Sequence, residues 1–207
     1  LAASPTRADP RDLLLFRRES LGKKELTFLT SSPRRTFATQ KCLAKLLPFP
    51  VSAISTKPVR GNIATRLRKL ALGEGDGLFM AKAALDRLLS AQVPQEDFAA
   101  ARSELRDLLG NFLFMVLPLS LFPTAPAQGA LALEIRADRE DLCELLTPLH
   151  DFDTAACVER ERSRFSSYGG GCHQKIGITA VKHPRLGLIE FFHGHPENRE
   201  AERKIAF

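Results

Sequence analysis

Two hydroxyls and two guanidiniums stand together in one short stretch of the sequence, Ser31-Ser32-Pro33-Arg34-Arg35. The alternating segment before it, 25–30, predicts a β-strand, and a serine N-cap followed by proline predicts a helix that runs to Leu47. A helix start offers backbone N–H groups, and arginine pairs with carboxylate in a bidentate fork. This stretch therefore has the chemistry of a carboxylate-binding site. An ordinary helix cap with exposed arginines is the alternative.

A second basic group, Arg60-Gly61-Asn62 with Thr65-Arg66, follows the next expected strand, 51–59. It leads into an expected helix at 63–72, so Arg60 lies at a strand end and Arg66 one to two turns into the helix. These residues could bind an anion, and a solvated basic face is the alternative.

A third group, Gly169-Gly170-Gly171-Cys172-His173-Gln174, places a cysteine on a glycine loop. Three glycines allow positive φ angles and a close approach to a ligand. A free structural cysteine beside a flexible turn is the alternative. A Cys-His protease site is disfavoured, because adjacent cysteine and histidine side chains rarely face each other.

The histidines and cysteines give little support for a metal site. His193 and His195 stand two apart, but no third ligand lies nearby, so we expect solvated loop histidines and no metal. The four cysteines form no C-x-x-C pair. So few cysteines in a chain of this length favour reduced thiols and a cytoplasmic location.

Composition narrows the class of partner. The 207 residues are 44% hydrophobic and 26% charged, which is enough for a packed core. The net charge is +6, but lysines and arginines form no long run, tryptophan is absent and there is one tyrosine. These features disfavour nucleic acid, and the longest apolar run, 112–122, is too short to span a membrane. A carboxylate-rich small molecule fits the scattered arginines better.

Strands and helices alternate from residue 13 to 117, which predicts an α/β layered domain with a largely parallel sheet. Such sheets bind ligands at the carboxyl ends of their strands. Further strands are expected at 13–16, 78–81 and 112–117, and further helices at 83–91 and 98–109. A strand at Ala130–Arg136, helices at 139–149 and 154–165, and two antiparallel strands at 176–181 and 186–192 should follow.

The order of these motifs resembles the hydroxymethylbilane synthase (porphobilinogen deaminase) family. The resemblance spans Ala8 to Ala180. It is carried by Ala8-Asp9-Pro10-Arg11-Asp12, by Thr30 to Arg35, by Val59 to Leu67, by 75–77, by 83–88, by 126–131, by Thr154-Ala155, by Glu161-Arg162, by 170–172 and by 176–177.

The resemblance implies a transferase of haem and tetrapyrrole biosynthesis. Such enzymes join four porphobilinogen molecules head to tail into hydroxymethylbilane and release ammonia at each step. The chain grows on a dipyrromethane cofactor, which the resemblance attaches covalently to Cys172. It also implies that cofactor and substrate carboxylates are bound by Ser31, Ser32, Arg34, Arg35, Arg60, Arg66, Gln128 and Gly129. A further pocket arginine corresponds to Arg102 or Arg106, and Lys82 stands where small residues are common.

The implied fold is α/β, with a type II periplasmic-binding-protein-like domain, a partial second lobe and a partial small α+β C-terminal domain. We expect a connector and hinge at 1–22, the second α/β domain at 23–125, a return segment at 126–147, and the C-terminal cofactor-carrying domain at 148–207.

The chain is expected to be a fragment at both ends, with most of the first domain preceding it. The family's catalytic aspartate belongs to that domain, so no catalytic residue is assigned here, and the fragment alone should be inactive. The complete enzyme is expected to be a cytoplasmic monomer with no nucleic-acid or membrane partner. The alternative is a catalytically inactive carboxylate- or pyrrole-binding module derived from the same fold.

Overall fold

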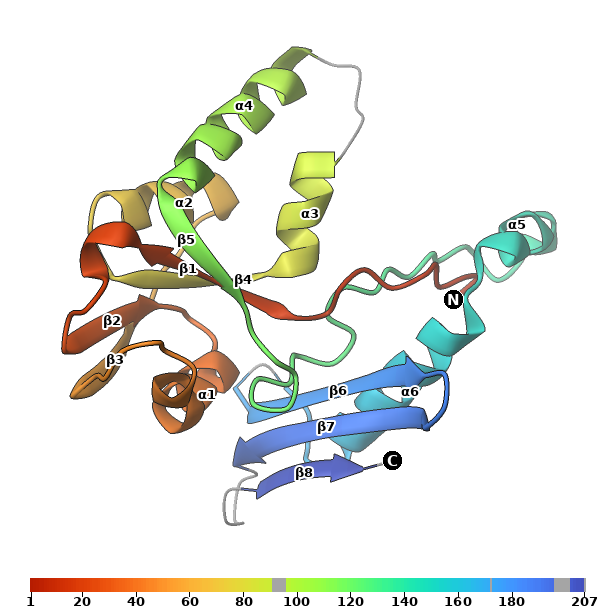
Figure 1. Cartoon of the computed structure of the whole chain (residues 1–207). Coiled ribbons are helices and arrows are strands. Elements are labelled where there is room, and N and C mark those ends of the chain that lie inside the picture. The colour runs from red at the N-terminus through yellow and green to blue at the C-terminus, as the bar shows by residue number, and fades with distance from the viewer. Residues whose placement is uncertain (91–95, 172, 196–201, 207) are drawn as a thin grey trace.

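The computed structural model describes residues 1–90, 96–171, 173–195 and 202–206, which form two sheets with helices against them (Figure 1). The larger sheet has the strand order β3-β2-β4-β1-β5. Its strands are β1 (Asp12–Arg17), β2 (Glu25–Leu29), β3 (Ala53–Lys57), β4 (Gly77–Ala81) and β5 (Phe112–Val116). The smaller sheet has the order β6-β7-β8.

The larger sheet is covered on both faces, as alternation along β1 requires. Leu13 and Leu15 face the core beneath α2 (Ile63–Ala71), α3 (Lys82–Ser90) and α4 (Glu96–Gly110). Leu14 and Phe16 face the opposite core, beneath α1 (Pro33–Cys42). The expected α/β class is therefore confirmed.

The larger sheet is mixed, so the expectation of a largely parallel sheet holds only in part. β2 is parallel to β3 and β4, whereas β1 is antiparallel to both of its neighbours, β4 and β5. The connection from β1 to β2 contains only a short 3₁₀ turn, Arg18–Ser20. A parallel return would need a longer crossover, so the chain reverses direction here.

Helix α1 begins as its sequence predicts. Ser32 is the N-cap, its Oγ accepts a hydrogen bond from the Arg35 N–H, and Pro33 occupies the first turn. The α-helix ends at Cys42, and a 3₁₀ turn at Leu43–Lys45 replaces the rest of the helix expected to reach Leu47.

The strand expected at Ala130–Arg136 is wrong. Only Leu133 forms a β-bridge, an isolated one with Ala3. The Leu133 carbonyl accepts from the Ala2 N–H and its N–H donates to the Ala3 carbonyl. This isolated bridge is the only β-pairing of 130–136 among the described residues, so no ladder forms.

The C-terminal unit holds β6 (Lys175–His183), β7 (Gly187–His195) and β8 (Glu202–Ala206), with α6 (Phe152–Ser166) packed on β6. The helix α5 (Glu140–Leu146) precedes it. β6 and β7 confirm the expected antiparallel pair. Gly177 allows β6 to approach the larger unit, because a Cβ there would lie 2.2 Å from the Pro123 carbonyl oxygen. No helix in the described part of the chain is both long and apolar enough to cross a membrane.

Candidate carboxylate-binding site

Both arginine-bearing segments lie at one edge of the larger sheet. β3, β2 and β4 are neighbours and run in the same direction, so their carboxyl ends meet at that edge (Figure 1). The segment 30–35 follows β2, the segment 58–62 follows β3, and Lys82 follows β4. This edge is the place where open α/β sheets bind ligands.

Ser31 joins the first two segments. Its Oγ donates to the Val59 carbonyl over 2.7 Å and accepts from the Val59 N–H over 3.0 Å. Val59 is buried and directly precedes Arg60. Ser31 therefore fixes where the second basic segment begins, while Ser32 caps α1.

Arg34 and Arg35 converge on Asp12 at the start of β1, which was not predicted as a site residue. The Arg34 Nη1 donates to one carboxylate oxygen over 2.8 Å, and the Arg35 Nη2 donates to the other over 2.8 Å. The predicted Gln128 joins them, since its Nε2 donates to Asp12 over 3.0 Å and to the Pro10 carbonyl over 2.6 Å. Three of the predicted site residues thus meet at one carboxylate.

Asp12 is fully buried, and this burial alone would raise its pKa. The attraction of Arg34 and Arg35 outweighs it and holds the pKa of Asp12 far below its ordinary value. Asp12 therefore stays ionised and orients both guanidiniums. With its oxygens engaged in this way, Asp12 is a positioning residue.

Arg60 and Arg66 do not reach this cluster. The side chain of Arg60 is exposed, and the Arg66 Nε donates to the Gly61 carbonyl over 2.7 Å. Asn62 caps α2 through the Thr65 N–H, as its position at the helix start favours. Within the described residues neither arginine pairs with a carboxylate, so both keep charge for an anionic ligand.

Gln128 and Gly129 lie against the connector. Gly129 has φ +88°, and a Cβ there would lie 2.6 Å from the Ala8 carbonyl oxygen, so only glycine fits without strain. The Gly129 carbonyl accepts from the Ala8 N–H and from the Arg87 Nη2. Arg87 was not predicted, and the structure places it beside this expected site segment.

A buried ion pair joins the connector to the C-terminal unit. Arg7 donates to both carboxylate oxygens of Glu161 on α6, which is fully buried. The same carboxylate accepts from the N–H groups of Ala127 and Ala180. One side chain thus fastens the connector, the return segment and β6 together.

The glycine loop has the backbone that its sequence predicts. Gly169, Gly170 and Gly171 have φ angles of +89°, +63° and +96°. Cys172 itself lies outside the described residues. On the far side of the loop the Gln174 side chain donates to the Tyr168 carbonyl over 3.0 Å, which ties the two ends of the loop to each other.

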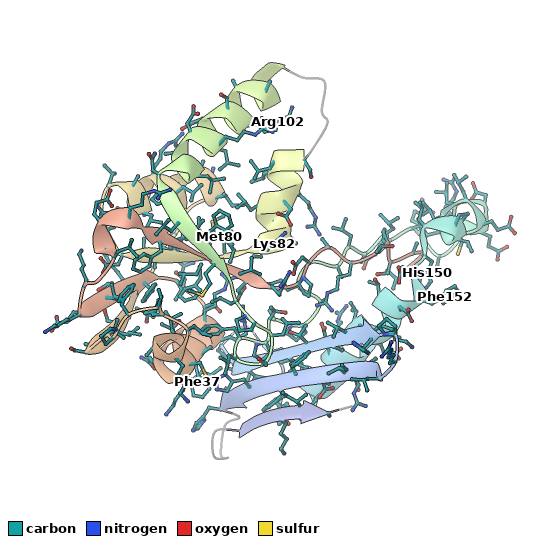
Figure 2. All side chains as sticks on the ribbon, in the orientation of Figure 1. Phe37, Met80, Lys82, Arg102, His150 and Phe152 are labelled. Atoms are coloured by element: carbon teal, nitrogen blue, oxygen red, sulfur yellow. The ribbon has the colours of Figure 1, made fainter. Side chains whose placement is uncertain are left out.

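The structure also places the two C-terminal histidines and the two candidate pocket arginines of the helix α4. His193 and His195 lie on β7 and not on a loop, and His193 is buried against Phe37, because this end of β7 packs on α1. The described residues contain no group of three or more metal-ligating side chains. Arg102 and Arg106 lie on α4, and Figure 2 shows Arg102 well away from Phe37 on α1.

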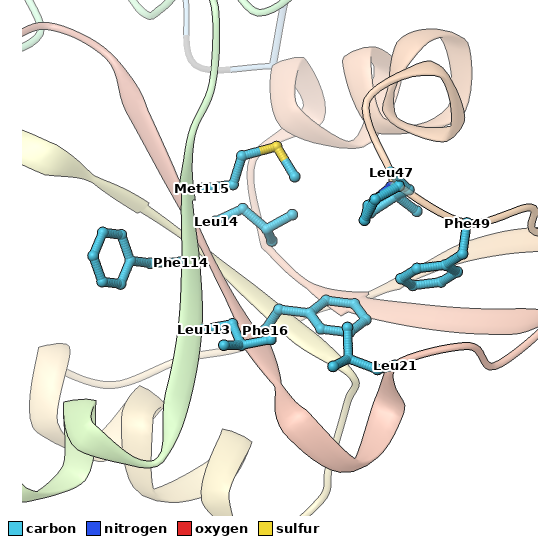
Figure 3. Close-up of a pocket in the computed structure, with 9 residues that line it drawn as sticks. Leu14, Phe16, Leu21, Leu47, Phe49, Leu113, Phe114 and Met115 are labelled. Carbon is cyan, nitrogen blue, oxygen red and sulfur yellow. The ribbon is translucent and has the colours of Figure 1, made fainter.

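The hollows of the structure differ in chemistry. One of about 280 Å³ on the α1 face of the sheet is lined by Leu14, Phe16, Phe49, Met115 and other apolar residues (Figure 3). No charged side chain of the described residues lines it, so it does not suit a carboxylate. Another of about 430 Å³ lies beside α1, and both Ser31 and Lys175 line it.

Comparisons with known proteins identify the family of the chain. The family model described as porphobilinogen deaminase, dipyromethane cofactor binding domain, matches residues 1–144. The match ends before Cys172, so the attachment of the cofactor there stays a prediction.

Curated relatives named porphobilinogen deaminase match most of the chain. A porphobilinogen deaminase of Chromobacterium violaceum is 38% identical over 87% of this chain and 51% of its own length. Those of Mycolicibacterium gilvum and Laribacter hongkongensis are 35% and 34% identical over 87% and 95% of this chain. The chain spans about half the length of these relatives.

Among solved structures, one from a study of glutathione import and the cystine ABC importer TcyBC of Streptococcus mutans is 11% identical, with a TM-score of 0.35, over 81% of this chain and 57% of that chain. A similarity this low carries no argument. The family model and the relatives instead decide the assignment, and the chain belongs to the porphobilinogen deaminase family.

Proposed function

We propose that the protein containing this chain is a hydroxymethylbilane synthase. It joins four porphobilinogen molecules head to tail, and each new carbon–carbon bond between pyrroles is accompanied by the loss of one ammonia. The observation that carries this proposal is the gathering of the predicted basic segments at the carboxyl ends of β2 and β3, in a chain of this family.

The residues present fit a ligand with many carboxylates. Arg34, Arg35, Arg60 and Arg66 provide four guanidiniums near a sheet edge where Asp12 provides one buried carboxylate. A dipyrromethane bound here would supply the primer on which the pyrrole chain grows. Arginine suits this task because its planar fork matches a carboxylate and stays charged.

The chain's own residues have separate tasks in this proposal. Asp12 and Gln128 orient the guanidiniums of Arg34 and Arg35, and Arg60 and Arg66 offer positive charge to pyrrole acetate and propionate groups. Cys172 holds the cofactor through a thioether. The reaction's acid–base group is proposed to lie outside this chain, because the oxygens of Asp12 are engaged by its neighbours.

We also propose the domain division given by the resemblance. The α/β unit at 23–125 would be one lobe of a type II periplasmic-binding-protein-like pair, with 1–22 and 126–147 leading to the other lobe and 148–207 carrying the cofactor. The support is that 1–4 and 130–133 run beside each other outside the larger sheet, where a second lobe could add partners. A cytoplasmic, monomeric enzyme remains part of the proposal.

The test uses the protein expressed from its complete coding sequence. Incubation with porphobilinogen should release one ammonia for each porphobilinogen consumed and yield a linear tetrapyrrole detectable by mass spectrometry. A protein that neither releases ammonia nor consumes porphobilinogen would contradict the proposal.

A further inference from the structure

The hollow of about 430 Å³ beside α1 belongs to two units of the fold at once. One wall comes from the face of α1 that carries Thr36, Phe37 and Gln40, together with Ser31 before the helix. The other wall comes from Lys175, the first residue of β6 in the C-terminal unit. A ligand held here would contact both units.

The lining of this hollow favours an anion. Lys175 is the only charged side chain among the described residues that line it, and no carboxylate is present. In the part of the chain that the structure describes, no carboxylate pairs with the Lys175 ammonium. A cleft lined by one sign of charge attracts the opposite sign.

The rest of the lining suits a flat ring that carries acidic groups. Phe37 and the two prolines Pro33 and Pro58 provide apolar surface. Gln40 is exposed and offers amide N–H donors. An apolar wall with a few convergent polar groups is typical of small-molecule sites.

Lys175 is also close in sequence to the predicted attachment point of the cofactor, Cys172. Lys175 follows Cys172 by three residues, and three residues of extended chain span at most about 11 Å. The Cα atoms of the two residues are therefore no further apart than this, whatever the conformation between them. A pyrrole chain attached at Cys172 would therefore start three residues before a residue that lines the hollow.

We propose that Lys175 is a further binding residue, whose ammonium pairs with a pyrrole carboxylate lodged in the hollow beside α1. This inference rests on the proposed function and deepens it. The side chains that bind the pyrrole carboxylates would then come from the C-terminal unit as well as from the α/β unit. Lys175 would be the one that lies three residues after the attachment point.

The test compares Lys175→Ala, Lys175→Gln and Lys175→Arg in the protein expressed from its complete coding sequence. Lys182→Ala is the matched control, because Lys182 lies near the other end of β6 and outside the hollow, 3.6 Å from Asp153. The readouts are kcat and KM for porphobilinogen at low and high NaCl, and the fraction of protein that carries the cofactor, from intact mass.

Loss of the ammonium should raise KM roughly two- to fivefold in the alanine and glutamine variants, as expected for a solvent-exposed pair with a carboxylate. The increase should shrink at high NaCl, and Lys175→Arg should resemble the wild type. Unchanged KM in both neutral variants, with the cofactor present and the wild type active, would overturn the role of Lys175 alone. An equal increase in Lys182→Ala would overturn it too. A wild-type protein with no cofactor and no turnover would instead overturn the proposed function, and the role of Lys175 with it.

Discussion

Replacement of Asp12 by asparagine removes one charge and almost no volume from the centre of the candidate site. In the wild type this carboxylate accepts hydrogen bonds from Arg34, Arg35 and Gln128, and both Asp12 and Arg34 are buried. The variant leaves two neighbouring guanidiniums without their counter-charge. Breaking a buried ion pair in this way costs about 3–5 kcal/mol, so we expect Asp12→Asn to lower the free energy of unfolding by that amount at pH 7.

The effect should depend on pH in a defined direction. Burial alone would raise the pKa of Asp12, but the attraction of Arg34 and Arg35 lowers it by more than burial raises it. The pKa of Asp12 in the folded protein therefore lies below its unfolded value of about 3.9. The stability that the carboxylate provides is complete above the unfolded pKa and is lost as pH falls through the folded pKa. The difference between wild type and Asp12→Asn should therefore be largest at neutral pH and narrow below about pH 4.

Urea unfolding followed by far-ultraviolet circular dichroism measures this difference, since the chain has no tryptophan to report by fluorescence. Asp138→Asn is the control, because the pair of Asp138 with Arg136 is exposed and its loss should leave the free energy of unfolding unchanged. A loss below about 1 kcal/mol for Asp12→Asn, or a loss equal to that of the control, would refute the argument that a buried carboxylate holds the arginines.

Three further substitutions test other parts of the structure. Glu161→Ala removes the partner of Arg7 and of two backbone N–H groups. It should lower the free energy of unfolding by about 3–5 kcal/mol and speed hydrogen exchange at the Ala127 amide. Gly129→Ala forces a Cβ towards a carbonyl at positive φ and should cost about 1–3 kcal/mol in chemical unfolding, whereas Gly110→Ala meets open space and should change stability little. Arg60→Ala should lower kcat/KM for porphobilinogen about tenfold in steady-state assays while the unfolding midpoint stays unchanged, because its side chain is exposed; full activity would contradict its role in carboxylate binding.

Most elements of the fold were predictable because their signals are local. The apolar run of β1, the alternation along β2 and the Ser32 cap predicted two strands and a helix start to within a few residues. The segment 130–136 failed because a strand requires a partner that its own sequence cannot specify. β8 was missed for a similar reason, since its five residues gain their pairing from β7.

The arginines of the site could be predicted from the sequence, but the residues that pair with them could not. Arg34 and Arg35 stand out next to a helix cap, whereas Asp12 reads as one acidic residue before an apolar strand. Its role depends on the order of strands in the sheet, which brings β1 beside β4 and under the start of α1. The Arg7–Glu161 pair joins residues far apart in sequence, and no local pattern indicates it.

Peptide mapping of the protein expressed from its complete coding sequence tests the central proposal most directly. The account predicts that the peptide containing Cys172 is heavier than its sequence by a dipyrromethane, and that Cys172→Ser abolishes this mass. An unmodified Cys172 peptide from a protein that turns over porphobilinogen, or a dipyrromethane on another residue, would contradict it.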